Sequence, residues 1–197
     1  YSHTMNFFSD LGLYNSWSGE ANFLSNILFS YSLLFVGIGI ISFYTAMHFI
    51  LKKDNNLILF SKIGIIIAFI SSFGFILVGF TPSDRLLEYH MFSVNLAFRS
   101  FLIVMLIYTY LIFKSSYIPN SFSFIYFILF CLVGYYVYIL MVGPELPGVS
   151  KNQEGFFIPS ESALFFHVIS QKIVIYGLSF SILCQIFLLR KKEYTSI

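Results

Sequence analysis

The sequence predicts an all-α integral membrane protein with five transmembrane helices, and three observations lead to this fold class. Hydrophobic residues make up 58% of the 197 residues, charged residues make up only 10%, and the mean hydropathy is +0.83. A soluble domain would carry about a quarter charged residues. The apolar segments are long, and none shows the short alternation of a strand, so helices that satisfy their own backbone hydrogen bonds are expected.

We expect a single polytopic domain over residues 1–197, in which residues 1–20 form a polar and aromatic segment at the membrane surface. Each predicted span exceeds the roughly 20 residues needed to cross a hydrocarbon core. The spans are predicted at about 23–51, 57–80, 89–113, 121–142 and 163–189.

We expect the protein to lie in the cell membrane, with the lipid bilayer as a partner. The distribution of lysine and arginine predicts that the N-terminus is on the outer side of this membrane and the C-terminus on the inner side. If the helices alternate, one side of the membrane receives most of the basic residues: Lys52, Lys53, Lys62, Lys114, Arg190, Lys191 and Lys192. The net charge of +2 does not indicate a nucleic-acid partner, because the positive charges lie beside the ends of the spans.

A pattern of eight residues occurs twice with the same spacing, each time at the start of a predicted span. One copy consists of Phe80, Pro82, Ser83, Asp84, Leu87, Tyr89, His90 and Ser93, and the other of Phe157, Pro159, Ser160, Glu161, Leu164, Phe166, His167 and Ser170. The proline ends the preceding segment, the serine is a helix cap, and the acid lies at the positive end of the helix dipole. The pattern predicts helical-hairpin repeats, each with an imidazole just inside the outer membrane surface.

A weaker third copy precedes the first span, at Ser18, Glu20 and Ala21. It implies three hairpins, of which the first has lost its opening helix. The parent architecture would then have six helices, with an N-terminal helix missing from this chain.

Polar residues inside the fifth span fall on one helical stripe, which should face neighbouring helices because polar groups facing lipid would be unpaired. The stripe consists of His167, Ser170, Gln171, Gly177, Ser181 and Gln185. The stripe has two possible roles: its polar side chains form contacts between helices, which we favour, or they line a path for a ligand. Lys172 lies on the other side of the helix, near its outer end, and can extend its amine toward the surface.

The third span carries two polar faces: His90 lies on one, and Asn95 and Arg99 share the opposite one. Arg99 is about 14 Å deeper than His90, and a charge there costs on the order of 3 kcal/mol or more without a partner or a wet cavity. No acid lies at a matching depth in any predicted span. The alternatives for its partner are a lipid phosphate, a bound anion, a tyrosine hydroxyl of the fourth span (Tyr135, Tyr136 or Tyr138), a missing helix, and backbone carbonyls.

These features predict an outward-facing polar pocket between the repeat helices that binds a lipid or a small molecule. Its expected residues are Asp10, Asp84, His90, Glu161, His167 and Gln171. One alternative is a metal-dependent intramembrane lipid hydrolase, in which two imidazoles and nearby carboxylates hold zinc and activate water. Another is an accessory subunit of a larger membrane complex, whose polar stripes face partner proteins.

The spacing of the histidines argues against a metal site, because the chain contains no HxxH, HxxxH or HExxH pair. We therefore favour histidines bonded to loop carbonyls over metal ligands, and a bis-histidine haem has no further support. The sequence identifies no catalytic residue and no cofactor.

Three short motifs together resemble one known family. Asn6 to Gly12 form an N-x-x-S-D-L-G run, Gly79 to Asp84 form a G-x-x-P-x-D run that is followed by His90, and Gln171, Lys172 and Ile173 follow on the last span. The chain resembles the small prokaryotic membrane proteins known as "domain of unknown function 998". The resemblance implies a six-helix bundle and no particular activity; the family opens with a helix before the first motif, and Lys172 stands where it commonly has arginine.

Overall fold

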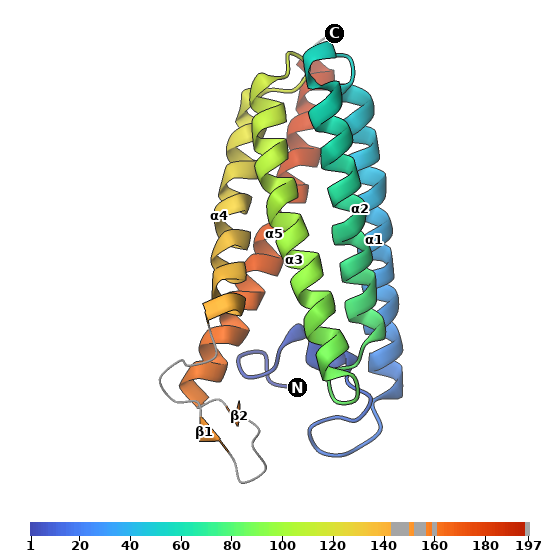
Figure 1. Cartoon of the computed structure of the whole chain (residues 1–197), viewed down its shortest axis with the longest axis vertical. Coiled ribbons are helices and arrows are strands. Elements are labelled where there is room, and N and C mark those ends of the chain that lie inside the picture. Colours follow the sequence, from blue (N-terminus) through green and yellow to red (C-terminus); the bar gives the residue numbers. More distant parts are fainter. Residues whose placement is uncertain (143–149, 152–156, 159–160, 196–197) are drawn as a thin grey trace.

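The computed structural model describes residues 1–142, 150–151, 157–158 and 161–195, and within them it contains five long helices (Figure 1). All five are long and apolar enough to cross a membrane. The prediction of a helical multi-pass membrane protein is therefore confirmed.

The helices begin within two residues of the predicted starts, and the last helix continues beyond its predicted end. The elements in chain order are η1 (Phe8–Gly12), α1 (Phe23–Leu51), η2 (Asn55–Leu57), α2 (Ile58–Phe80), α3 (Leu87–Lys114), α4 (Asn120–Val142), β1 (Ser150–Lys151), β2 (Phe157–Ile158) and α5 (Glu161–Thr195). The two short strands pair antiparallel, with Ser150 opposite Ile158.

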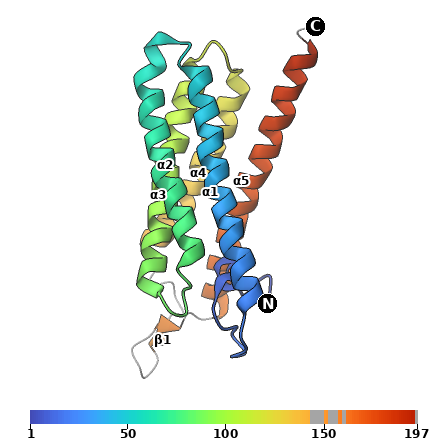
Figure 2. The ribbon, with the colours of Figure 1, turned by 90° about the vertical axis from the view of Figure 1, so that its right-hand side faces the viewer.

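The helices pack in chain order, so that α1 contacts α2, α2 contacts α3, α3 contacts α4 and α4 contacts α5. Figure 2 shows α5 leaning away from the other helices toward its C-terminal end. Because α5 packs chiefly on α4, the bundle is open between α1 and α5.

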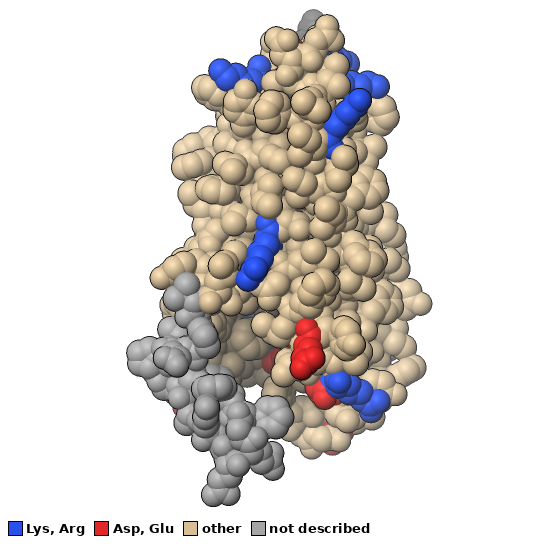
Figure 3. Space-filling view, in the orientation of Figure 1, with Lys and Arg blue, Asp and Glu red and all other residues tan. Residues whose placement is uncertain are grey.

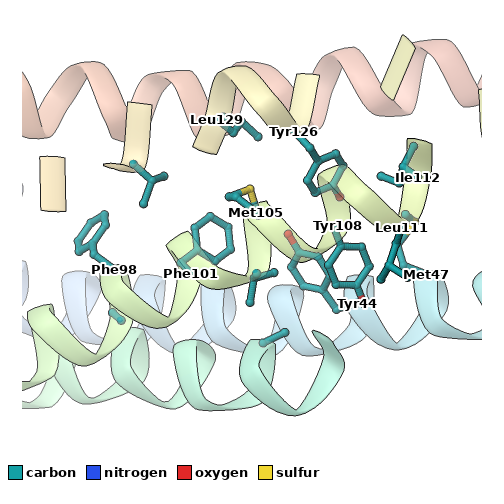
Figure 4. Packing of buried hydrophobic residues seen from close by; sticks show 14 of the residues in the cluster. Tyr44, Met47, Phe98, Phe101, Met105, Tyr108, Leu111, Ile112, Tyr126 and Leu129 are labelled. Carbon is teal, nitrogen blue, oxygen red and sulfur yellow. The ribbon is translucent and has the colours of Figure 1, made fainter. Parts of the chain in front are cut away.

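Aromatic side chains fill the centre of the bundle (Figure 4). The rings of Tyr44 and Tyr108 are 4.6 Å apart between centroids, and Tyr126 stacks on Tyr108 at 6.1 Å. Phe75 and Phe101 make an edge-to-face contact in the same cluster. These ring contacts link the four helices α1, α2, α3 and α4. Because lipid tails are as apolar as the side chains, the hydrophobic effect does not drive helices together within a bilayer, and dispersion between closely packed side chains is a main source of stability.

Small residues allow α2 to approach α3 closely. A Cβ atom on Gly74 would lie 2.5 Å from the backbone nitrogen of Ala97 and 2.7 Å from its Cα atom. Beside this contact, the hydroxyl of Ser71 donates a hydrogen bond to the carbonyl of Ala97 at 2.9 Å. A small residue with a serine bond beside it is a common way to join helices within a membrane.

The two copies of the repeated sequence pattern lie in different local structures. In the first copy, α3 begins at Leu87 with Leu86 at its N-cap position and no side-chain cap, so the expected cap at Ser83 is not formed. Asp84 therefore precedes the helix, whereas the corresponding Glu161 begins α5. Pro159 and Ser160 of the second copy lie outside the described residues, and the structure gives the repeat no support.

Replacing Gly74 by alanine should destabilise the protein, because the new methyl group meets backbone atoms of α3 that cannot rotate away. Overpacking of this kind costs about 1–3 kcal/mol, which thermal unfolding of the purified protein in detergent would detect. Gly39→Ala is the matched control, since nothing lies within 4 Å of a Cβ atom at Gly39. Equal melting temperatures for the two variants would contradict this account of the contact.

Candidate functional site

The N-terminal segment, residues 1–21, folds across the end of the bundle where α1 and α5 begin (Figure 1). Asp10 organises its short helix η1 by accepting hydrogen bonds from the backbone N–H of Phe7 at 3.0 Å and from the Asn6 amide at 3.1 Å. Partial burial, together with the nearby Asp10 carboxylate, raises the pKa of the Tyr1 hydroxyl. The segment is thus an ordered part of the structure.

Side chains at the start of α1 bind the carbonyl groups of this segment. Ser25 donates to the carbonyl of Leu11 at 2.8 Å, and Asn26 donates to the carbonyl of Gly12 at 2.6 Å. Asn22 donates to the Leu11 carbonyl as well, at 3.3 Å. Carbonyls that would otherwise be unpaired are thereby satisfied by one helix.

The connection between α2 and α3 binds the other end of the segment. The Asp84 carboxylate accepts hydrogen bonds from the backbone N–H groups of Tyr14 and Asn15, at 3.0 Å each. The guanidinium group of Arg85 lies 3.5 Å from the centroid of the Tyr14 ring. Hydrogen bonds to a carboxylate are stronger than neutral ones, so Asp84 is a major attachment point.

Helix α5 holds the segment from the opposite side. The Lys172 amine donates to the backbone carbonyls of His3 and Asn6, the latter at 2.7 Å, and only 3% of this residue is exposed. One turn further along α5, the hydroxyl of Tyr176 forms a hydrogen bond of 3.1 Å with the His3 ring. The Lys172 side chain extends toward the surface as expected, but its amine binds the N-terminal segment instead of water.

A cavity of about 550 Å³ lies beneath the N-terminal segment, between α1 and α5. It extends inward to α2 and α3. Its lining consists of Phe8, Ser9, Leu11, Leu24, Ser25, Leu28, Phe29, Ser32, Leu33, Phe75, Val78, Val94, Phe98, Gln171 and Ile175. Eleven of these fifteen side chains are apolar, so the wall offers mainly dispersion contacts to an occupant.

Three of the four polar side chains in the wall already have partners. The hydroxyls of Ser25 and Ser32 donate to backbone carbonyls at 2.8 and 2.7 Å. Gln171 accepts a hydrogen bond from the backbone N–H of Phe8 at 2.9 Å and interacts with the Tyr136 side chain. A ligand in the cavity therefore needs few polar groups, because few hydrogen-bonding groups of the wall remain unpaired.

Three of the six predicted pocket residues either belong to the N-terminal segment or bind it. Asp10 lies within it, Asp84 binds its amide groups, and Gln171 both binds Phe8 and lines the cavity. Their common role is to position the segment that covers the cavity. The polar pocket itself stays a prediction.

The other three predicted pocket residues make no hydrogen bond or ring contact with the N-terminal segment. His90 is buried, and its Nδ1 atom lies 2.7 Å from the carbonyl of Thr81, which confirms for this residue the interpretation as a histidine bonded to a loop carbonyl. His167 is half-buried and packs edge-on against Phe166. Glu161 is exposed at the start of α5.

Within the described part of the chain, no three His, Cys, Asp or Glu side chains gather closely enough to hold a metal ion. On the two predicted faces of α3, His90 is buried and Arg99 is exposed, while Asn95, which was predicted to share the face of Arg99, is partly buried.

Sequence reasoning missed the residues that attach the N-terminal segment to α1, namely Asn22, Ser25 and Asn26. A cluster of amide and hydroxyl side chains at the start of an apolar span was the available signal. Such side chains are suited to bind a neighbouring loop that lacks its own backbone pairing.

No family model, curated protein or solved structure matches the chain. The candidate site therefore rests on geometry alone. It consists of the cavity and the N-terminal segment that covers it.

Replacing Asp84 by alanine should release the N-terminal segment near Tyr14, because two backbone N–H groups lose their acceptor. Hydrogen bonds to a charged group contribute about 1.5–3 kcal/mol when buried and less at an exposed position such as this one. Hydrogen–deuterium exchange should show faster exchange of the Tyr14 and Asn15 amides, with the core of α2 and α3 unchanged. Glu88→Ala is the control, since Glu88 lies on the same end of the bundle, and equal exchange in both variants would contradict the assignment.

Proposed function

We propose that this protein binds the hydrocarbon chain of a lipid, or an apolar molecule of similar size, in the cavity beneath the N-terminal segment. The observation that carries the proposal is the cavity itself, which measures about 550 Å³ and has a mainly apolar wall. Volumes of about 300–1,000 Å³ are typical of ligand sites. The proposed ligand is thus of the class expected from the sequence, a lipid or a small molecule, but it occupies an apolar cavity and not the predicted polar pocket.

The chemistry of the wall favours hydrocarbon over water as the occupant. A buried water needs two to four polar partners, and the serines and the glutamine of the wall have used much of their hydrogen-bonding capacity. An empty apolar cavity forfeits the dispersion contacts of its lining. A hydrocarbon chain from the surrounding bilayer restores these contacts without leaving any polar group unpaired.

The arrangement of the helices supports entry from the side. Helices α1 and α5 both contribute to the lining, and they contact each other little because α5 packs on α4. A lipid chain would pass between them, while its polar head would remain near the N-terminal segment. The segment closes the cavity from the membrane surface and leaves the lateral approach open.

We further propose that the N-terminal segment lies on the outer side of the cell membrane and that residues 1–197 act as one membrane domain. Lys52, Lys53 and Lys114 lie at the opposite end of the bundle, and basic side chains gather at that end in Figure 3. Basic residues favour the cytoplasmic side. Membership of the "domain of unknown function 998" family and descent from a six-helix parent remain proposals that rest on the sequence motifs.

A fluorescent fatty acid with a dansyl group near the end of its tail tests the proposed function. Its emission should rise when it enters the cavity of the purified protein in detergent, and an unlabelled fatty acid should displace it. Ser32→Trp and Leu28→Trp place bulk in the cavity and should weaken binding by about tenfold or more, which corresponds to about 1.4 kcal/mol.

Tyr31→Trp is the matched control, since Tyr31 is exposed on the same helix and does not line the cavity. It should bind the probe within about twofold of the natural protein, a difference well below the 1.4 kcal/mol of a tenfold change. Circular dichroism and thermal unfolding confirm that each variant is folded. Folded Ser32→Trp and Leu28→Trp variants with unchanged affinity would rule out this cavity as the binding site.

A further inference from the structure

An exposed arginine lies near the middle of the third membrane span. Arg99 is about 18 Å from the start of α3 at Leu87 and about 22 Å from its end at Lys114, at 1.5 Å of rise per residue. Figure 3 shows a basic side chain about midway along the molecule, on a part of the surface that is otherwise mostly uncharged. Either surface of a hydrocarbon core about 30 Å thick would then be about 15 Å away, farther than an arginine side chain extends.

Among the residues that the structure describes, none is a partner for this charge. Arg99 makes no hydrogen bond, ion pair or ring contact with any described residue. One turn before it, Asn95 donates to the carbonyl of Met91 at 2.8 Å, while its Oδ1 atom is buried without a hydrogen-bond partner. Two adjacent groups are thus left with unused hydrogen-bonding capacity inside the membrane, where each such group is costly.

The described spans of a second copy of this chain would not neutralise Arg99. The acidic residues within the five candidate spans lie in first turns, as Glu88 does in α3 and Glu161 in α5. Two facing copies of Arg99 would repel each other. Neither the described spans of this chain nor those of a second copy therefore place a carboxylate at this depth.

The surface around Arg99 has the spacing of a helix-binding face. Its side chains recur along α3 at alternating steps of four and three residues, and all but Leu96 are exposed: Phe92, Leu96, Arg99, Ile103, Leu106, Tyr110 and Phe113. A repeat of 3.5 residues is the pattern by which two helices pack along their length. The face continues into a groove of about 530 Å³ between α3 and α4, which Leu106 and Phe127 help to line.

We propose that the Arg99 face of α3 binds a transmembrane helix of another protein that carries an aspartate or glutamate near mid-membrane. The planar guanidinium group can donate two parallel hydrogen bonds to that carboxylate and another to Asn95 Oδ1. Apolar side chains of the partner would occupy the groove between α3 and α4. Charge and geometry thus select one kind of partner.

A synthetic helix provides a defined test. A leucine- and alanine-based transmembrane peptide with one central glutamate is reconstituted with the full chain in lipid nanodiscs, and association is measured by energy transfer between dyes on the two chains. The glutamate peptide should bind the natural protein about tenfold more tightly than the same peptide with leucine or glutamine at that position, equivalent to about 1.4 kcal/mol. Equal binding of the glutamate and glutamine peptides would overturn the proposed ion pair.

Substitutions in the protein locate the effect. Arg99→Leu should abolish the preference for glutamate, and Arg99→Glu should shift it to a peptide with central arginine. Lys62→Leu is the matched control. Lys62 is also exposed inside a span, but it lies on α2, near the start of that helix. Loss of the preference in Lys62→Leu, or its survival in Arg99→Leu, would overturn the proposal.

The stability of the isolated chain separates binding from a structural role. Because Arg99 has no partner among the described residues, Arg99→Leu should leave the melting temperature in nanodiscs unchanged or raise it. A lower melting temperature combined with no loss of the glutamate preference would show that Arg99 supports the fold instead.

Discussion

The hydrogen bonds that hold the N-terminal segment across the bundle are the constraint on which the candidate site depends. The four helices α1 to α4 pack on one another in sequence, but α5 reaches α1 mainly through this segment. Asn26 of α1 binds the segment from one side and Lys172 of α5 binds it from the other. Without these attachments, nothing in the described part of the chain would cover the space between the two helices.

The same attachments explain why a polar cluster surrounds an apolar cavity. Backbone groups of the segment need partners, and the polar side chains of α1, α5 and the α2–α3 connection provide them. Once Gln171 has bound Phe8 and Ser25 has bound Leu11, little polarity remains to face the cavity. The polar residues thus hold the N-terminal segment in place, and the apolar residues form the wall of the cavity.

The positions of the helices could be predicted from the sequence because span length and hydropathy are local properties. The faces of α3 could be predicted for a related reason, since Arg99 and Ala97 differ so strongly in the cost of burial. The start of α3 was predicted less well. Ser83 and Asp84 have the residue types of a helix cap, yet Asp84 binds the amides of Tyr14 and Asn15 instead, a contact between distant parts of the chain.

The cavity could not be predicted from the sequence, because its wall consists of ordinary apolar residues from several elements. Leu28, Val78 and Ile175 look the same in sequence whether they face lipid, another helix or a cavity. Only the relative placement of α1 and α5 distinguishes these cases. Histidines, by contrast, are rare in this sequence and ionisable, which is why a pocket role was predicted for them. In the structure, the Nδ1 atom of His90 contacts the Thr81 carbonyl.

The cavity and the Arg99 face use different sides of α3. Val94 and Phe98 point into the cavity, while Arg99 is exposed and Asn95 is only partly buried. A partner helix seated along Arg99 would extend toward α4, whereas a lipid chain would enter between α1 and α5. The two proposed sites therefore do not overlap. The side chains of the two sites are one residue apart on α3, so the helix itself separates the cavity from the exposed face that carries Arg99.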